Sequence, residues 1–231
     1  MQKTIGLIGG LTWLSTLDYY RLINQLTNQQ LGRSSSAKIL LYSVNFEEVK
    51  TLTIAGNWDG IAKLMTSVAQ NLENAGADCI LLGANTMHHV ADKVRAAINI
   101  PLIHIAEVTA TAIKLKGLQT VALLGTKYTM QLPFYSNKLA EQGIKTIIPN
   151  QADIDFVNES IYTELGNNIF LPATKEKYLN IIASLVAQGA EGVILGCTEI
   201  PIFIKQTDCT VPVFDTALIH ATAAVHFALG S

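Results

Sequence analysis

Short hydrophobic runs alternate with longer segments of helical spacing along the whole chain. The short runs are rich in Ile, Val and Leu and are bounded by Gly, Pro or polar residues, which is typical of buried strands. Strands that alternate with helices predict βαβ units and parallel sheets. The predicted strands cover residues 4–8, 38–43, 79–82, 102–105, 120–124, 146–148, 192–195 and 211–214, and the predicted helices cover 15–32, 58–75, 88–98, 107–116, 134–142, 175–188 and 216–229.

The hydrophobic pattern occurs twice. Residues 75–85 (AGADCILLGAN) resemble residues 188–198 (QGAEGVILGCT), which lie 113 positions later. Two further pairs of segments match in the same order and at nearly the same offset: 4–9 with 120–125, and 101–106 with 212–217. Matching order and spacing indicate an internal duplication, in preference to the general likeness of any two buried βα units.

The duplication predicts the domain organisation. We expect an α/β protein with two similar lobes, each with a parallel-sheet core, related by a pseudo-two-fold axis. Residues 1–106 with 210–231 would form the first lobe, and residues 107–209 the second. Because ligands of parallel sheets bind beyond the carboxyl ends of the strands, we expect an active-site cleft between the lobes.

Two polar segments follow equivalent strands and mark the predicted site. Ala84-Asn85-Thr86 follows the strand of the first repeat, and Cys197-Thr198-Glu199 follows that of the second. The symmetry would place position 84 opposite Cys197. Two groups that flank one carbon atom suit removal of a proton from one face and delivery to the other, and a thiol suits both steps. This chemistry is cofactor-free racemisation or epimerisation.

Composition narrows the function classes. The net charge is −2 and Lys and Arg form no run, which disfavours a nucleic-acid binder. No apolar run reaches the length of about 18 residues that a membrane span needs. The N-terminal segment lacks the pattern of a signal peptide, so we expect a cytoplasmic protein. Three cysteines without a CxxC pair predict neither a disulfide framework nor a zinc site.

Each candidate residue also has a structural interpretation. Cys197 could be a small buried hydrophobic residue, the commoner fate of a free cysteine. Thr86 and Thr198 could serve only as N-caps of the helices that follow them. His88 is a candidate for orienting the site, and His220 for a structural polar group.

Several motifs resemble the aspartate/glutamate racemase superfamily. Gly-Cys-Thr-Glu-Ile-Pro at 196–201 and Asn-Thr-Met-His at 85–88 are similar to its paired signatures. The resemblance extends to residues 8–13, 124–130 and 213–216, almost from end to end. It is closest to the branch that includes the L-aspartate/glutamate-specific enzymes.

The resemblance implies a function and a set of site residues. It implies that the two lobes are Rossmann-like. It also implies an amino-acid racemase for aspartate- or glutamate-like substrates, with a two-base mechanism, no pyridoxal phosphate, no metal and commonly a homodimer. Cys197 would act as the base on the face of the L-enantiomer. The implied substrate-binding residues are Leu11, Thr12, Asn85, Thr86, Thr126, Thr129 and Thr198.

One position departs from the family pattern. Residue 84, where the family carries Cys or Thr, is Ala, which has no proton to give or accept. The second acid/base is therefore missing, and three functions stay open. They are a racemase weakened on one face, a single-cysteine decarboxylase or lyase, and a catalytically impaired protein that binds amino acids or dicarboxylates.

Overall fold

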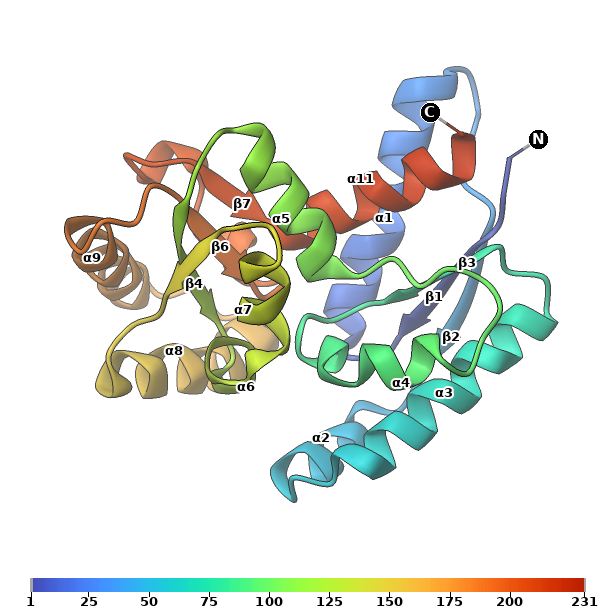
Figure 1. Ribbon diagram of the computed structural model, residues 1–231, viewed down its shortest axis with the longest axis horizontal. Coiled ribbons are helices and arrows are strands. Elements are labelled where there is room, and N and C mark those ends of the chain that lie inside the picture. The colour runs from blue at the N-terminus through green and yellow to red at the C-terminus, as the bar shows by residue number, and fades with distance from the viewer. Residues whose placement is uncertain (1, 231) are drawn as a thin grey trace. The chain divides into compact units, whose positions relative to one another are not determined.

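The computed structural model describes residues 2–230. The chain forms two compact units, and each has its own parallel sheet. The first unit comprises the described residues up to His104 together with those from His220 onward, and the second is Ile105–Ile219. The predicted α/β class with two parallel-sheet cores is confirmed (Figure 1).

The first unit contains a three-stranded parallel sheet of order β2-β1-β3. β2 is partly exposed, whereas β1 and β3 are buried along their whole length. Its strands are β1 (Ile5–Gly9), β2 (Ile39–Ser43) and β3 (Cys79–Leu82). Its helices are α1 (Trp13–Leu31), α2 (Phe46–Ile54), α3 (Trp58–Asn74), the 3₁₀ turn η1 (Thr86–Val90), α4 (Ala91–Arg95) and most of α11 (Thr216–Leu229).

The second unit contains a four-stranded parallel sheet of order β5-β4-β6-β7. Its strands are β4 (Thr120–Gly125), β5 (Lys145–Ile147), β6 (Val193–Gly196) and β7 (Val213–Asp215). Its helices are α5 (Ile105–Leu115), α6 (Lys127–Gln131), α7 (Pro133–Ala140), α8 (Gln151–Thr163), α9 (Pro172–Ala187) and α10 (Ile200–Phe203), with 3₁₀ turns η2 (Leu165–Asn167) and η3 (Gln206–Asp208).

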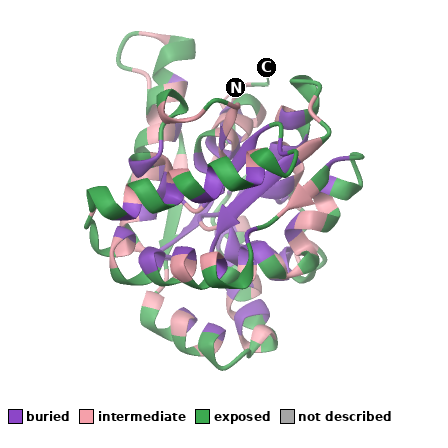
Figure 2. Ribbon diagram, turned by 90° about the vertical axis from the view of Figure 1, so that its left-hand side faces the viewer, coloured by how far each residue is buried: buried purple, intermediate pink, exposed green. Residues whose placement is uncertain are grey.

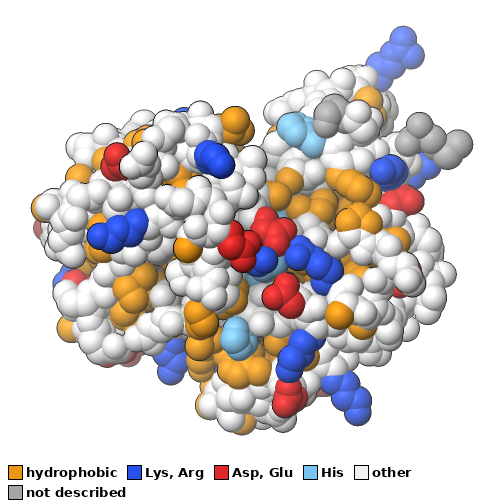
Figure 3. Space-filling model, in the orientation of Figure 1, with side chains coloured by type: hydrophobic (Ala, Val, Ile, Leu, Met, Phe, Trp, Pro, Cys, Tyr) orange, Lys and Arg blue, Asp and Glu red, His pale blue; other side chains and the backbone are white. Residues whose placement is uncertain are grey.

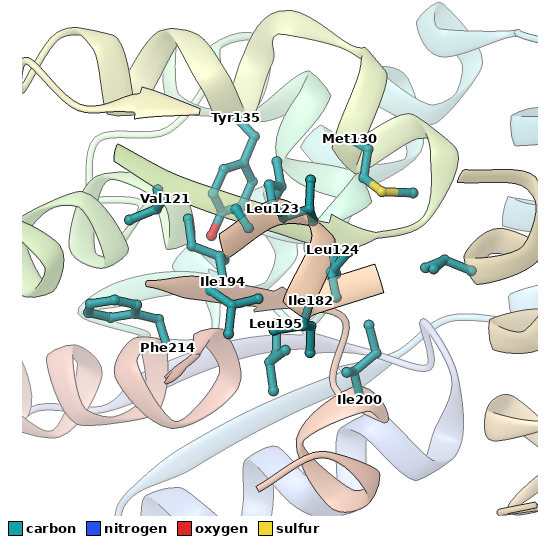
Figure 4. Close-up of a cluster of buried hydrophobic side chains, with 14 of the residues drawn as sticks. Val121, Leu123, Leu124, Met130, Tyr135, Ile182, Ile194, Leu195, Ile200 and Phe214 are labelled. Carbon is teal, nitrogen blue, oxygen red and sulfur yellow. The ribbon is translucent and has the colours of Figure 1, made fainter. Parts of the chain in front are cut away.

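The core of the second unit forms on its central strands. Figure 4 shows Leu123 of β4 and Leu195 of β6 among side chains that come from the helices, such as Tyr135 and Ile182. All four side chains are buried. Figure 2 shows central strands of the fold in purple, as buried elements. Burial on both faces explains why these strands read as continuous Ile, Val and Leu runs and do not alternate.

The structure differs from the sequence-based prediction in its strands, its helices and its lobe boundary. The strand predicted at 102–105 is reduced to an isolated bridge between Ile80 and Leu102. Helices α2 and α8 were not predicted. The predicted lobe boundary at 210 also differs from the observed division, because β7 pairs with β6 and residues 210–219 therefore belong to the second unit.

Equivalent hydrogen bonds repeat in the two units. The Asp78 carboxylate accepts a hydrogen bond from the backbone N–H of Thr4 at 2.6 Å, and the Glu191 carboxylate accepts one from that of Thr120 at 2.8 Å. Each acidic side chain therefore ties the start of the third strand in its unit to the start of the first. This repeated detail supports the internal duplication beyond hydrophobic patterning.

The last strand segment of each repeat also repeats its pairing. The N–H of Ile80 donates to the carbonyl of Pro101, and the N–H of Val193 donates to that of Pro212, both at 2.9 Å. The isolated bridge at Leu102 is therefore the counterpart of β7.

The final helix of each repeat packs in the other repeat's unit. α5 follows the bridge of the first repeat but contributes Ile105 and Ile113 to the core of the second unit. α11 follows β7 of the second repeat but crosses α1 of the first unit and contacts it (Figure 1). Its Ala228 carbonyl accepts a hydrogen bond from the N–H of Lys3 at 2.9 Å. The two units therefore exchange their last helices.

His220 fixes α11 to the first unit. Its Nε2 atom lies 2.8 Å from the carbonyl oxygen of Ile103, which can only accept, so Nε2 carries the proton. Its Nδ1 atom then accepts a hydrogen bond from the Tyr19 hydroxyl at 2.8 Å. Both side chains are fully buried. The imidazole therefore satisfies both ring nitrogens only while α1 and α11 stay together.

We expect Tyr19→Phe to lower the free energy of unfolding by about 1–3 kcal/mol, because it leaves the buried Nδ1 atom of His220 without its donor. Urea unfolding measures this change. Tyr20→Phe is the matched control, since Tyr20 is 54% exposed, and it should change stability by less than about 0.5 kcal/mol. Equal stability of the two variants would contradict the role of the Tyr19–His220 bond.

Candidate active site

The first group of candidate residues lies in the turn where β1 ends. Thr12 caps α1, because its hydroxyl accepts a hydrogen bond from the N–H of Ser15 at 3.1 Å. The Ser15 hydroxyl in turn donates to the carbonyl of Gly83 at 2.8 Å, which joins this turn to the end of β3. Thr12 has a positive φ of 134°, a conformation that β-branched residues rarely adopt. Such strained residues concentrate at functional sites.

Gly10 allows the turn after β1 to approach the end of β2. Its φ of +76° favours glycine, and an added Cβ atom would collide with the backbone of Val44. The N–H of Gly10 donates to the Thr16 hydroxyl at 2.8 Å. The neighbouring Leu11 is 5% exposed and belongs to the hydrophobic core of the first unit. The structure thus places Leu11 as a packing residue at the edge of this turn.

The second group of candidate residues is the polar segment 84–86, which follows β3. Ala84 is half-buried, whereas Asn85 and Thr86 are buried. The carbonyl of Ala84 accepts a hydrogen bond from Nδ1 of His88 at 3.0 Å. Position 84 therefore presents a methyl group, and its backbone is held by an imidazole. Thr86 is the first residue of η1 and not its N-cap, so the capping interpretation does not apply to it.

Three buried histidine rings gather beneath this segment. The ring centroid of His88 lies 4.7 Å from that of His104 and 5.4 Å from that of His220. Burial lowers the pKa of His88 well below its usual value, and the neighbouring His104 adds to this effect. Burial, with a smaller effect of His88, lowers the pKa of His220 to about 3. His88 and His220 are therefore uncharged near neutral pH.

The candidate residues of the second unit gather where β4 and β6 end. Thr126 caps α6, because its hydroxyl accepts a hydrogen bond from the N–H of Thr129 at 3.2 Å. This bond is equivalent to the one in the first unit, where the Thr12 hydroxyl accepts from the N–H of Ser15. The Thr129 methyl group lies against the glycines that end both strands, and a Cβ atom added to Gly196 would lie 3.2 Å from it. Glycine thus lets Thr129 sit over the paired strand ends.

Cys197 follows β6 and makes a hydrogen bond with a carboxylate. Its Sγ atom donates to Oε2 of Glu199 at 2.9 Å, and the Thr198 hydroxyl donates to the same oxygen at 2.8 Å. Glu199 is only 4% exposed. Burial raises the pKa of the Cys197 thiol well above its usual value, and the charge of Glu199 raises it further. Backbone N–H groups of residues 198 and 199 oppose this shift but do not outweigh it.

Two residues near Cys197 had no role assigned from the sequence: Glu199, which was named only as part of the polar segment 197–199, and Tyr162. The signal for Glu199 was an acidic side chain two positions after the cysteine. Tyr162 lies on α8, whose presence was not predicted. Its pKa is raised to about 12, first by burial and then by the nearby charge of Cys197. The Tyr162 hydroxyl therefore lies within electrostatic reach of the thiol.

The remaining cysteines lie elsewhere in their units. Cys79 is fully buried within β3, and burial raises its pKa to about 12. Cys209 is half-buried in the loop before β7. Of the three thiols, Cys197 alone therefore follows a strand in a polar loop.

Residues 2–230 lack two kinds of feature. No group of three or more His, Cys, Asp or Glu side chains there is arranged to hold a metal ion. No helix in this range has the length and hydrophobicity needed to cross a membrane. On the face shown in Figure 3, Lys and Arg side chains are dispersed among acidic ones.

Comparison with known families agrees with this geometry. The model of the Asp/Glu/hydantoin racemase family matches residues 8–224, which include every candidate residue. The chain belongs to this family. Membership supports amino-acid racemase activity in general terms.

Solved structures of family members have the same fold. A protein of Yersinia pestis, provisionally assigned as an Asp/Glu racemase, is 47% identical, with a TM-score of 0.93 over 98% of this chain and 99% of that one. An aspartate racemase homologue from Pyrococcus horikoshii is 37% identical, with a TM-score of 0.87 over 99% and 100% of the two chains. The broad-specificity amino-acid racemase RacX of Bacillus subtilis is 23% identical over 174 residues, 72% of each chain.

We expect stability to fall in mild acid. The unfolded chain protonates His88 and His220 below a pH of about 6.5, whereas the folded chain keeps both neutral. The unfolded state then binds more protons, so each histidine lowers the free energy of unfolding by up to about 1.4 kcal/mol per pH unit as the pH falls from there towards the folded pKa. Urea unfolding between pH 7.5 and 5 measures the slope.

His220→Gln should remove one histidine's share of this slope. His226→Gln, on the same helix but exposed, should leave the slope unchanged. A full slope in His220→Gln would show that His220 is not held neutral in the folded protein.

Proposed function

We propose that this protein is a cofactor-independent amino-acid racemase that acts on aspartate- or glutamate-like substrates. The observation that carries the proposal is the Cys197 thiol at the carboxyl end of β6, in a chain that belongs to a racemase family. By the same resemblance, we propose a cytoplasmic homodimer that needs neither pyridoxal phosphate nor a metal.

Cys197 acts on the α-proton of the L-enantiomer. As thiolate it removes the proton from Cα, and as thiol it returns one to the same face of the planar carbanion. Cys197 and Thr198 follow β6, and Thr126 and Thr129 follow β4, whose end is paired with that of β6. Thr126, Thr129 and Thr198 therefore bind the substrate carboxylate in this proposal. Asn85 and Thr86 add an amide and a hydroxyl from the equivalent segment of the first unit.

Ala84 makes the two faces of the substrate unequal. Position 84 would supply the acid/base of the opposite face, but a methyl group moves no proton. Protonation on that face then depends on water or a weak hydroxyl such as that of Thr86. Exchange of the α-proton through Cys197 should therefore be faster than inversion of configuration.

We expect L-aspartate or L-glutamate to exchange its α-proton in heavy water with this protein present. Cys197→Ala should slow exchange by at least about 100-fold, the usual contribution of an acid/base group. NMR follows the loss of the α-proton signal, and polarimetry or chiral chromatography follows inversion. Cys209→Ala, a half-buried cysteine of the same unit, is the control and should retain activity. Absence of exchange with a panel of amino acids would refute the proposed activity.

We expect Ala84→Cys to raise the rate of inversion towards the rate of exchange, because it restores a thiol to the opposite face. Ala84→Val adds bulk without a proton and is the matched control, which should give no gain. The ratio of inversion to exchange is measured on one sample in heavy water. An unchanged ratio in Ala84→Cys would show that position 84 does not face the substrate.

The single thiol favours a second candidate function. One cysteine suffices to protonate a carbanion left by loss of carbon dioxide from a substituted malonate. Release of carbon dioxide with one-sided protonation would distinguish this decarboxylase from a racemase. Stabilisation by a dicarboxylate without turnover would instead indicate a binding protein.

A further inference from the structure

His88 holds two consecutive carbonyl groups of the polar segment 84–86. Its Nδ1 atom lies 3.0 Å from the carbonyl oxygen of Ala84, and its backbone N–H donates to the carbonyl of Asn85, also at 3.0 Å. Because a carbonyl oxygen only accepts, Nδ1 carries the proton of the neutral ring. Across a trans peptide, C=O and N–H point in opposite directions, so the N–H groups of Asn85 and Thr86 point away from the imidazole. The orientation of the whole segment therefore depends on one residue.

The other ring nitrogen of His88 gains nothing from its position. Nε2 is buried and has no hydrogen-bond partner among residues 2–230. The nearby carbonyl of Ile103 accepts from His220 and has no proton to offer. A buried acceptor without a partner is destabilising, and an apolar side chain would avoid this cost. Packing alone therefore does not explain a histidine at position 88, whereas the bond from Nδ1 to the carbonyl of Ala84 does.

Two further rings of the first unit hold the imidazole of His88 in place. The ring centroids of His104 and His220 lie 4.7 and 5.4 Å from its own, and both contacts are edge-on. His220 is itself fixed by hydrogen bonds at both of its ring nitrogens. Since His88 is only 2% exposed, its ring has little room to turn. The Nδ1 donor is therefore kept on its acceptor.

The second repeat has no equivalent of this imidazole. The position 113 residues after His88 is Pro201, in the first turn of α10. Proline has neither a side-chain donor nor a backbone N–H. The imidazole is therefore not part of the scaffold that the two repeats share. It occurs only where the first unit presents position 84 and the two candidate substrate-binding residues that follow it.

Resting on the proposed function, we infer that His88 is a positioning residue for substrate binding. It makes no contact with the substrate. It fixes the peptide units of the segment 84–86, so that Asn85 and Thr86 already have the geometry in which they bind the substrate carboxylate. Donors that are ordered in advance lose less conformational freedom on binding. Loss of the imidazole should therefore weaken substrate binding more than it slows proton transfer at Cys197.

His88→Leu removes the donor and keeps a buried side chain. Hydrogen–deuterium exchange, measured by mass spectrometry, should become at least about tenfold faster at the amides of residues 84–87, because the segment opens more often. The amides of β4 and β6 should keep their wild-type exchange, which shows that the second unit is folded. For α-proton exchange of L-aspartate or L-glutamate, KM should rise about tenfold while kcat changes by less than about threefold.

Two amide variants test the position of the donor without removing its polarity. In His88→Asn, the side-chain nitrogen can lie close to the position of Nδ1 and donate to the Ala84 carbonyl, so most of the protection and of the affinity should return. In His88→Gln, the nitrogen lies nearer the position of Nε2, and neither should return. This pair gives the answer even if His88→Leu does not fold.

His89→Leu is the matched control. Its ring belongs to the neighbouring residue of the same 3₁₀ turn, but it packs against Trp58 of α3, with 4.5 Å between the ring centroids. This variant should change neither the amide exchange of residues 84–87 nor KM.

The inference is overturned if loss of His88 leaves the amide exchange of residues 84–87 unchanged, or if that exchange rises while KM stays within about twofold of the wild-type value. Equal behaviour of His88→Asn and His88→Gln would also overturn it, since a structural role does not depend on where the donor lies. Amide exchange needs no substrate. If the wild-type protein exchanges no amino acid, the racemase proposal fails, and amide exchange alone then decides whether His88 holds the segment.

Discussion

Parallel pairing of the first and third strands in each unit is the constraint on which the candidate site depends. Gly125 of β4 and Gly196 of β6 are register partners, so the residues that follow them leave the sheet at the same edge. Glycine at both ends gives Thr129 room to lie over the pair. Thr126 and Cys197, 71 positions apart in the sequence, therefore open from neighbouring strand ends. In the first unit, the same pairing joins the turn after β1 to Gly83.

Burial then determines the protonation state of the groups at these ends. Each pKa unit corresponds to about 1.4 kcal/mol, and burying a charge costs several kcal/mol unless it is compensated. The N–H groups that follow Cys197 compensate only in part, so the thiol stays protonated. The same balance keeps His88 and His220 neutral. In the second unit, the protonated thiol of Cys197 therefore lies beside the buried side chain of Glu199.

The sequence predicted the features that arise from periodicity and repetition. The repeat located both sheets and placed Cys197 at a strand end, because buried strands need continuous hydrophobic runs. It missed α2 and α8, although Asn45 and Asn150 cap both helices and gave a local signal. The sequence did not predict the roles of side chains that contact one another. The bond between Cys197 and Glu199 depends on the rotamers and the turn of the backbone, which no spacing rule specifies.

The exchange of final helices has a consequence for biosynthesis. The second unit is one continuous segment, whereas the first lacks α11 until nearly the whole chain has been made. Tyr19 meets His220 only after 201 further positions have left the ribosome. Domains that emerge first usually fold first, but here the first unit cannot complete its core until the segment that follows the second unit has been made. Until then, the surface that α11 covers in the folded protein stays exposed.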